Sequence, residues 1–190
     1  MLKPEALDAA ILIDRLDRLA RNAEASGGLN PAQWEALRYL ARANRFSKTP
    51  TALASYLGST RGTVSQTLIA LEQKGYIARV QSAIDRRSID LALTPLGVSA
   101  IAGDPLSRLA ADLQRAAGAG LSTLSAQLRE TLYAAIARND GQVFGACETC
   151  IHFRRAASRS SEAPHHCALL DVPLSAADST AICVENVPRA

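Results

Sequence analysis

The residues best suited to chemistry in this chain are its four cysteines, which all lie in the last quarter of the sequence. Cys147 and Cys150 form a C-x-x-C pair, Cys167 follows after sixteen residues, and Cys183 after a further fifteen. A C-x-x-C turn brings two thiolates to one ion or cluster, and two distant cysteines can complete a four-thiolate site. The spacing predicts one metal centre formed by all four cysteines. Thiol redox chemistry at Cys147 and Cys150 is the alternative without a metal.

The spacing leaves the kind of metal open. Zinc ribbons usually pair two C-x-x-C knuckles, whereas here the second half-site is split between Cys167 and Cys183. A close pair with two scattered cysteines is more typical of iron–sulfur proteins, and in spacing alone it is similar to the iron–sulfur uracil-DNA glycosylases. We therefore expect an iron–sulfur cluster of the 4Fe–4S or 2Fe–2S type, with zinc as the alternative. Reserve ligands are His152, His165 and His166.

The cysteines belong to a segment, residues 141–190, that is poor in large apolar side chains. Turn-forming pairs such as Asp140–Gly141 and an Arg/Ser-rich stretch at 154–161 predict a loop-rich cysteine tail. Because a segment of this kind cannot build a large hydrophobic core, a bound metal is expected to supply the missing stability. The tail is thus predicted as a separate unit after a domain spanning residues 1–140.

Composition restricts the class of protein. The chain has 190 residues, 48% of them hydrophobic and 21% charged, as is ordinary for a globular protein. No apolar run approaches the length of a membrane span, and the amphipathic N-terminal segment carries acidic residues that a secretory signal lacks. We therefore expect a cytoplasmic protein with no membrane partner, in which clustered thiols bind metal rather than form disulfides.

The net charge of +3 is distributed unevenly. Between Pro31 and Gly97, nine Lys and Arg residues stand against four acidic residues, so this part carries the whole positive excess. A basic middle between neutral or acidic flanks indicates a polyanionic partner for the middle.

The basic middle is interpreted as a helix-turn-helix followed by a β-hairpin. Capping and glycine signals predict helices at about residues 30–44, 49–58 and 59–75. In the last of these, Val64 and Leu68 belong to the buried stripe, and a small, polar face points away from it. Such a face suits a helix that approaches a DNA groove and offers hydrogen-bonding groups to base edges. Two alternating strands then flank a polar tip with adjacent arginines.

These motifs resemble the MarR-type winged-helix regulators of transcription. The matching stretches are "LNPAQWEALRYLA", "LASYLGSTRGTVSQTLIALEQKGYIARV", "DRR" and "LTPLG", in the order and spacing of that family. The resemblance covers roughly residues 4–138, with a reading head at about 31–97, although the linker "RANRFSKTP" is more basic than usual. It implies a homodimer bound to double-stranded DNA operators. The residues that it places at the DNA are Ser59, Thr60, Arg61, Thr63, Ser65, Gln66, Arg79, Asp85, Arg86 and Arg87.

The flanking helices complete a fold that is mostly α with a small β-wing. A first helix over residues 4–25 has a wide apolar face with Leu12 and Leu16, and a last helix aligns Leu128 and Leu132. In the resembling family such helices form the dimer, so we expect a helical dimerisation region beside the winged helix-turn-helix. The alternative is that these stripes complete the monomer core. A metal centre placed after the last helix is expected to act by stiffening or releasing that helix.

These observations predict a DNA-binding repressor whose cysteine centre senses redox state or iron. In one alternative, the tail holds a purely structural zinc and a small aromatic compound or organic acid is the effector, as in many members of the resembling family. In another, the winged helix docks an iron–sulfur enzyme on DNA. The sequence has no nucleophile–base set, Gly-rich phosphate loop or carboxylate pair near the cysteines. We therefore expect a regulator and no enzyme.

Overall fold

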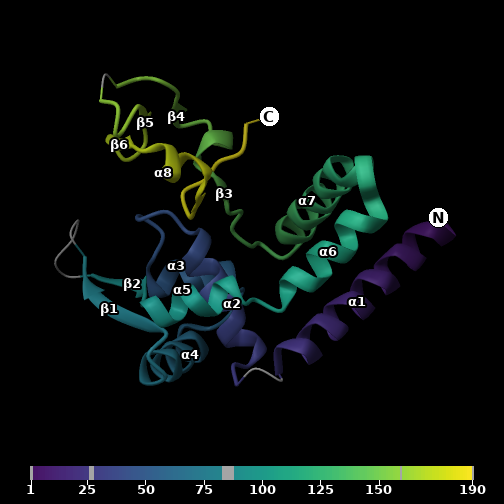
Figure 1. The fold of residues 1–190 in the computed structure, drawn as a ribbon. Helices are drawn as coiled ribbons and strands as arrows, with labels where there is room; N and C mark the ends of the chain where they lie inside the picture. Colours follow the sequence, from purple (N-terminus) through teal and green to yellow (C-terminus); the bar gives the residue numbers. More distant parts are fainter. Residues whose placement is uncertain (1, 26–27, 83–87, 159, 190) are drawn as a thin grey trace.

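The structure, a computed structural model, describes residues 2–25, 28–82, 88–158 and 160–189. Figure 1 shows a long helical arm, a central group of shorter helices with a β-hairpin at its side, and a C-terminal tail above that group. In the described ranges, no helix combines the length and the apolarity that crossing a membrane requires.

The central group, here called the reading head, follows the predicted order. Its elements are α2 (Pro31–Arg42), α3 (Pro50–Tyr56), α4 (Arg61–Gln73), β1 (Ile77–Gln81), β2 (Ile89–Leu93) and α5 (Pro95–Ala102). Local chemistry explains where the helices begin. Asn30 and Gln33 form a reciprocal capping box at α2, and Thr49 and Thr60 accept backbone hydrogen bonds at the starts of α3 and α4.

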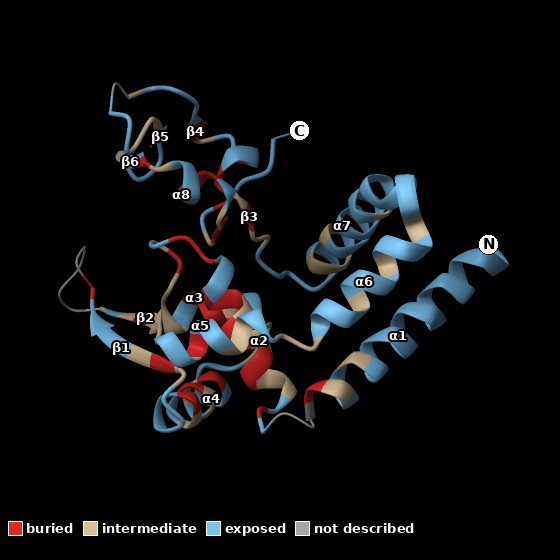
Figure 2. Cartoon of the chain, in the orientation of Figure 1, coloured by how far each residue is buried: buried red, intermediate tan, exposed pale blue. Residues whose placement is uncertain are grey.

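The core of the reading head is formed by the inward stripes of these helices and by the hairpin. Leu37, Leu40, Leu53 and Leu68 are fully buried, and Figure 2 shows the buried residues concentrated in α2, α3 and α4. Each such leucine contributes about 2 kcal/mol through removal of its side chain from water. The predicted stripe of α4 is confirmed, because Val64 lies buried beside Leu68.

The wing is a two-stranded antiparallel sheet. β1 and β2 pair from Ile77 with Leu93 to Gln81 with Ile89. Leu91 faces the core, whereas Ile89 near the far end is exposed. The wing tip, residues 83–87, lies outside the described residues.

The helical arm consists of α1 (Pro4–Ala25), α6 (Leu106–Ala117) and α7 (Leu121–Arg138), with a 3-10 turn before α7. α1 runs beside α6, and α6 folds back onto α7 (Figure 1). No residue of α6 or α7 is buried, and Leu12 of α1 and Leu132 of α7 are 50% and 55% exposed. The alternative that these apolar stripes complete the core of one chain is therefore wrong, since they lie exposed on it.

The tail is more regular than the turn signals indicated. Its elements are β3 (Gly145–Ala146), a 3-10 turn (Cys147–Thr149), β4 (Phe153–Arg154), β5 (His165–Cys167), β6 (Val172–Leu174), α8 (Ala176–Thr180) and β7 (Ile182–Cys183). β3 pairs with β7, and β4, β5 and β6 form a small antiparallel sheet. These two short sheets bring the cysteines together from four places in the tail.

Candidate functional site

The predicted DNA-reading residues lie on the outer face of α4 and at its start. Arg61, Thr63 and Gln66 are exposed, and Ser65 is half-buried. The side chains of Arg61 and Gln66 form no hydrogen bond or ion pair with a described residue, so both are available to a partner. The surface therefore combines one cation with several small polar groups, a set that can reach base edges.

Three predicted DNA contacts already have partners within the chain, because the hydroxyls of Thr60 and Thr63 are hydrogen-bonded to each other at 2.9 Å and Arg79 is ion-paired. Thr60 caps α4 by accepting a hydrogen bond from Thr63 N at 3.2 Å. Arg79 forms an ion pair with Glu72 at 3.2 Å, which holds it at the base of the wing. Half-buried Ser59 precedes the cap. The predicted contacts Asp85, Arg86 and Arg87 lie outside the described residues.

The four cysteines line one small pocket in the tail. Its volume is about 20 Å³, and the side chains of His152, Phe153, Leu169, Leu174 and Glu185 complete its wall. Cys147, Cys150 and Cys183 are buried and Cys167 is half-buried, and all four are free thiols. The predicted convergence of residues that are up to 36 positions apart is thus present in the structure.

Hydrogen bonds to sulfur surround this pocket. Asn44 Nδ2 donates to the Sγ of Cys147 at 3.3 Å, and the Val187 amide donates to the Sγ of Cys150 at 3.4 Å. The hydrogen bond from Cys147 lowers the pKa of Cys183 to about 6, and the side chains of Asn44 and Ser47 act in the same direction. The same bond to Cys183, together with burial, raises the pKa of Cys147.

The four thiols line the same pocket, but they are not arranged around one common position. Within the described ranges, no group of three or more His, Cys, Asp and Glu side chains is arranged to hold a metal ion. A metal would therefore require side-chain movements of the cysteines. Two reserve ligands are engaged elsewhere: His165 Nδ1 accepts from the Ala156 amide at 3.2 Å, and His166 pairs with Asp171 at 3.2 Å. His152 is the histidine that lines the pocket.

The tail is attached to the segment between α2 and α3, residues 43–49, here called the linker. Asn44 N donates to Ile182 O at 2.8 Å, and Val184 N donates to the Ser47 Oγ at 2.9 Å. Phe46 packs against the cysteine cluster. Further bonds come from Arg45, whose guanidinium donates to Pro173 O at 2.6 Å and lies 3.6 Å from Asp178.

These linker residues were missed as functional residues. The signal was the unusual composition of "RANRFSKTP", which is explained by the contacts of Arg45 and Phe46 with the tail. Nothing local shows that Asn44 reaches a sulfur atom or that Ser47 binds the tail, because their partners lie more than a hundred positions away.

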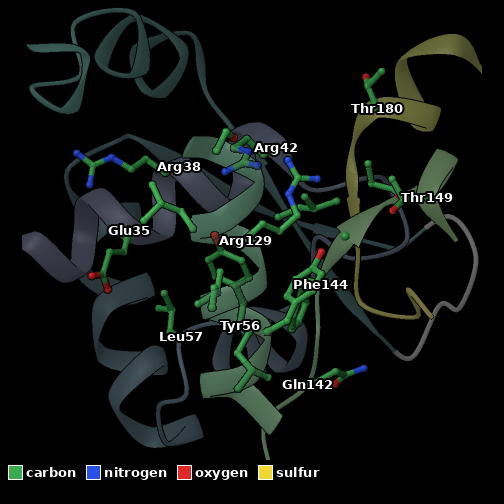
Figure 3. Close-up of a pocket in the computed structure, with 18 of the residues that line it drawn as sticks. Glu35, Arg38, Arg42, Tyr56, Leu57, Arg129, Gln142, Phe144, Thr149 and Thr180 are labelled. Carbon is green, nitrogen blue, oxygen red and sulfur yellow. The ribbon is translucent and has the colours of Figure 1, made fainter. Parts of the chain in front are cut away.

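A larger pocket of about 800 Å³ lies between the reading head, α7 and the tail. Figure 3 shows Arg42 and Tyr56 of the head, Arg129 of α7 and Phe144 of the tail among the residues that line it. The guanidinium groups of Arg42 and Arg129 form no hydrogen bond or ion pair with any described residue. Tyr133 also lines this pocket. Two free cations beside aromatic rings can bind an aromatic anion.

Comparison with known proteins identifies the fold of the reading head and arm. Residues 27–88 match a family model described as the MarR family. No curated protein matches the chain. Among solved structures, wild-type MarR in its apo form from E. coli has a TM-score of 0.53 at 23% identity, and the match covers 70% of this chain and 99% of that chain.

Two further solved structures carry ligands. The S. aureus MepR–DNA complex has a TM-score of 0.55 at 21% identity, covering 70% of this chain and 96% of that chain. CouR from Rhodococcus jostii RHA1, bound to p-coumaroyl-CoA, has a TM-score of 0.54 at 22% identity, covering 67% and 91%. The chain thus has the winged-helix fold of these proteins, and close to a third of it lies outside each match.

Proposed function

We propose that this protein is a DNA-binding regulator of transcription, a repressor that binds a pseudo-palindromic operator as a homodimer. The observation that carries this proposal is the small polar face of α4 with Arg61 and Gln66 free of partners. The MarR-family segment at residues 27–88 supports it, because members of that family regulate transcription and are not enzymes. In this proposal α4 lies in the major groove and the wing lies beside it.

Dimerisation is the second part of the proposal. The exposed leucines of α1 and α7, among them Leu12 and Leu132, leave a large apolar surface on the arm. Monomeric proteins rarely expose apolar surface on this scale, so a second copy of the chain is the expected partner. Two reading heads related by a two-fold axis then face half-sites whose centres lie about 10 bp apart.

DNA binding is tested by incubating the protein with a pool of DNA duplexes of random sequence and selecting the duplexes that bind. We expect an enriched pseudo-palindrome. Gln66→Ala should change base preference at one position in each half-site, whereas Arg86→Ala with Arg87→Ala should weaken binding to all sequences and flatten its salt dependence. Arg108→Ala on the exposed side of α6 is the matched control and should leave affinity unchanged. A pool without enrichment would overturn the assignment.

We propose further that Cys147, Cys150, Cys167 and Cys183 hold one metal centre whose occupancy changes operator affinity. The support is that all four cysteines line one pocket and that the sulfurs of Cys147 and Cys150 accept hydrogen bonds from N–H donors. A divalent cation would also allow Cys147 and Cys183 to be thiolates together. Since the pocket has a volume of about 20 Å³, close to that of one water site, a single zinc ion fits more readily than an iron–sulfur cluster.

Metal analysis of protein purified without oxygen distinguishes these cases. One zinc per chain with no visible absorption supports the single ion. Iron with acid-labile sulfide supports the cluster that the cysteine spacing favoured and a role in sensing redox state or iron. Operator affinity that is the same with and without metal would remove the sensing role and leave a structural one.

A second function is supported by the larger pocket. We infer that it takes a small aromatic acid or its thioester, because Arg42 and Arg129 are free cations beside Tyr56 and Phe144. CouR is a solved relative in fold with an aromatic CoA thioester bound. Titration with hydroxycinnamate and salicylate should release the selected DNA, and Arg42→Gln with Arg129→Gln should abolish the response without changing affinity for DNA alone.

A further inference from the structure

The linker is bonded on its inner side to the parts of the head that present the DNA-reading surface. Lys48 O accepts a hydrogen bond from the Leu91 amide of β2 at 2.7 Å. Thr49 Oγ1 caps α3 by accepting from the Ala52 amide at 3.1 Å. Since α3 packs against α4, this short segment is joined to both the wing and the reading helix.

On its outer side the same segment is hydrogen-bonded to Cys147 and to the strand end that carries Cys183. Asn44 is 2% exposed, and its side chain donates to Cys147 Sγ at 3.3 Å while its Oδ1 accepts from the Phe46 amide at 3.1 Å. Ser47 is fully buried, and its hydroxyl accepts a hydrogen bond at 2.9 Å from the amide of Val184, the residue that follows Cys183. The reading head therefore holds Cys147 directly and the segment that carries Cys183 through its neighbour.

We propose that Asn44 and Ser47 are positioning residues of the four-cysteine centre, and that through them the state of that centre sets the conformation of the wing and α3. This inference rests on the proposed metal centre. Metal sites depend on such outer partners, because a hydrogen bond to a ligand atom fixes its orientation and tunes its electron density. Here the partners belong to the DNA-reading unit, so the centre cannot change its ligand geometry without displacing the linker.

The contacts indicate that the cysteine centre acts on the reading head through the linker rather than through α7, the last helix of the arm. Between α7 and the tail lies the large pocket, which Ile136 of α7 and Phe144 of the tail both line. Figure 1 shows the tail on the side of the head away from α4, so direct contact between them does not occur within one chain. The sequence-based expectation that the centre acts by stiffening the last helix is replaced by action through Asn44 and Ser47.

The first test measures the electronic effect of these residues on the sulfurs. The wild-type chain, Asn44→Ala and Ser47→Ala are loaded with Co²⁺, and the sulfur-to-cobalt charge-transfer bands are recorded. Loss of the Asn44 hydrogen bond makes the Cys147 thiolate more electron-rich, so these bands should move to longer wavelength in Asn44→Ala. Zn²⁺ affinity, measured by competition with a chromophoric chelator, should fall by about 10- to 100-fold.

The matched control is Arg45→Ala. Arg45 lies in the same linker and binds the tail through Pro173 and Asp178, but it touches no sulfur. The sulfur-to-cobalt charge-transfer bands of the Arg45→Ala protein should stay at the wild-type wavelength. If all three variants behave alike, general loosening of the tail explains the result and the positioning role is overturned.

The second test asks whether the state of the cysteine centre changes the wing through the linker, a transmission here called the relay. Hydrogen exchange at the Leu91 amide, which donates to Lys48 O, is compared between Zn²⁺-loaded and metal-free protein. Zinc should slow exchange in the wild type, and it should have little effect in Asn44→Ala at saturating zinc. Equal responses in both proteins overturn the relay alone. If the wild type takes up neither cobalt, zinc nor iron, the proposed metal centre fails, and this inference fails with it.

Discussion

Arg38 in α2 and Asp104 just before α6 form a two-pronged ion pair, with Nε to Oδ2 at 2.7 Å and a second nitrogen to Oδ1 at 2.5 Å. The same guanidinium donates to Glu24 at the end of α1, also at 2.7 Å. One largely buried side chain therefore joins the reading head to two helices of the arm. The hydrogen bond to Asp104 raises the pKa of Arg38 above the ordinary value of an arginine, so Arg38 stays a cation.

Arg38→Ala should destabilise the fold by about 3 kcal/mol, because it leaves the carboxylates of Glu24 and Asp104 without their partner in a poorly hydrated place. Urea denaturation at a fixed chain concentration measures this change. Arg18→Ala is the control: Arg18 pairs with Asp14 on the exposed face of α1, and its loss should cost less than about 1 kcal/mol. Equal midpoints for the two variants would contradict the joining role.

The same pair makes stability depend on acidity. Burial opposes ionisation of Asp104, but hydrogen bonds from Arg38 and the Leu106 amide outweigh it and lower the pKa of this carboxyl below its ordinary value. A lowered folded-state pKa adds stability that is complete above the unfolded-state pKa and is lost as pH falls through the folded-state pKa. The difference in urea midpoint between wild type and Asp104→Asn should therefore be constant near neutrality and shrink below about pH 4. Asp112→Asn, at an exposed pair, should show no such trend.

Much of the fold was predictable because its signals are local. The capping box of Asn30 and Gln33 and the stripe of Val64 and Leu68 are visible within a few residues of sequence, and both are present. The convergence of the cysteines could be inferred from their spacing alone. Their attachment could not, because the bond between Asn44 and Cys147 joins positions 103 residues apart, and no periodicity connects such positions.

A charge on the arm should separate the dimer. Leu12→Asp places a carboxylate in the middle of the apolar face of α1, where it would be desolvated at an interface without a partner. Sedimentation equilibrium should show monomers at micromolar concentration, with unchanged helix content because Leu12 is half exposed in the single chain. Val98→Asp, at an exposed apolar position of α5, should stay dimeric. A dimeric Leu12→Asp protein would place the interface elsewhere.

Gly97 should tolerate no side chain. A methyl group there would overlap the carbonyl oxygen of Tyr76 and come within 3.2 Å of a Leu93 methyl group. Gly97→Ala is therefore expected to lower stability by about 1–3 kcal/mol through forced displacement of the wing from α5, measured as a shift of the urea midpoint. Gly62→Ala has open space, with its nearest neighbour at 3.9 Å, and should stabilise α4 by less than about 1 kcal/mol. A stabilised Gly97→Ala variant would show that the hairpin can move freely.

The placement of the tail on the side of the head away from α4 (Figure 1) leaves the DNA-reading surface uncovered. Metal and operator can then occupy one chain together, so neither has to displace the other. For two ligands bound at once, thermodynamic reciprocity requires that each change the affinity of the other by the same factor. If the cysteine centre proposed above changes operator affinity, operator DNA is in turn an effector of that centre, and a chain held on its operator would keep or release its metal at a different free-metal concentration from a chain free in solution.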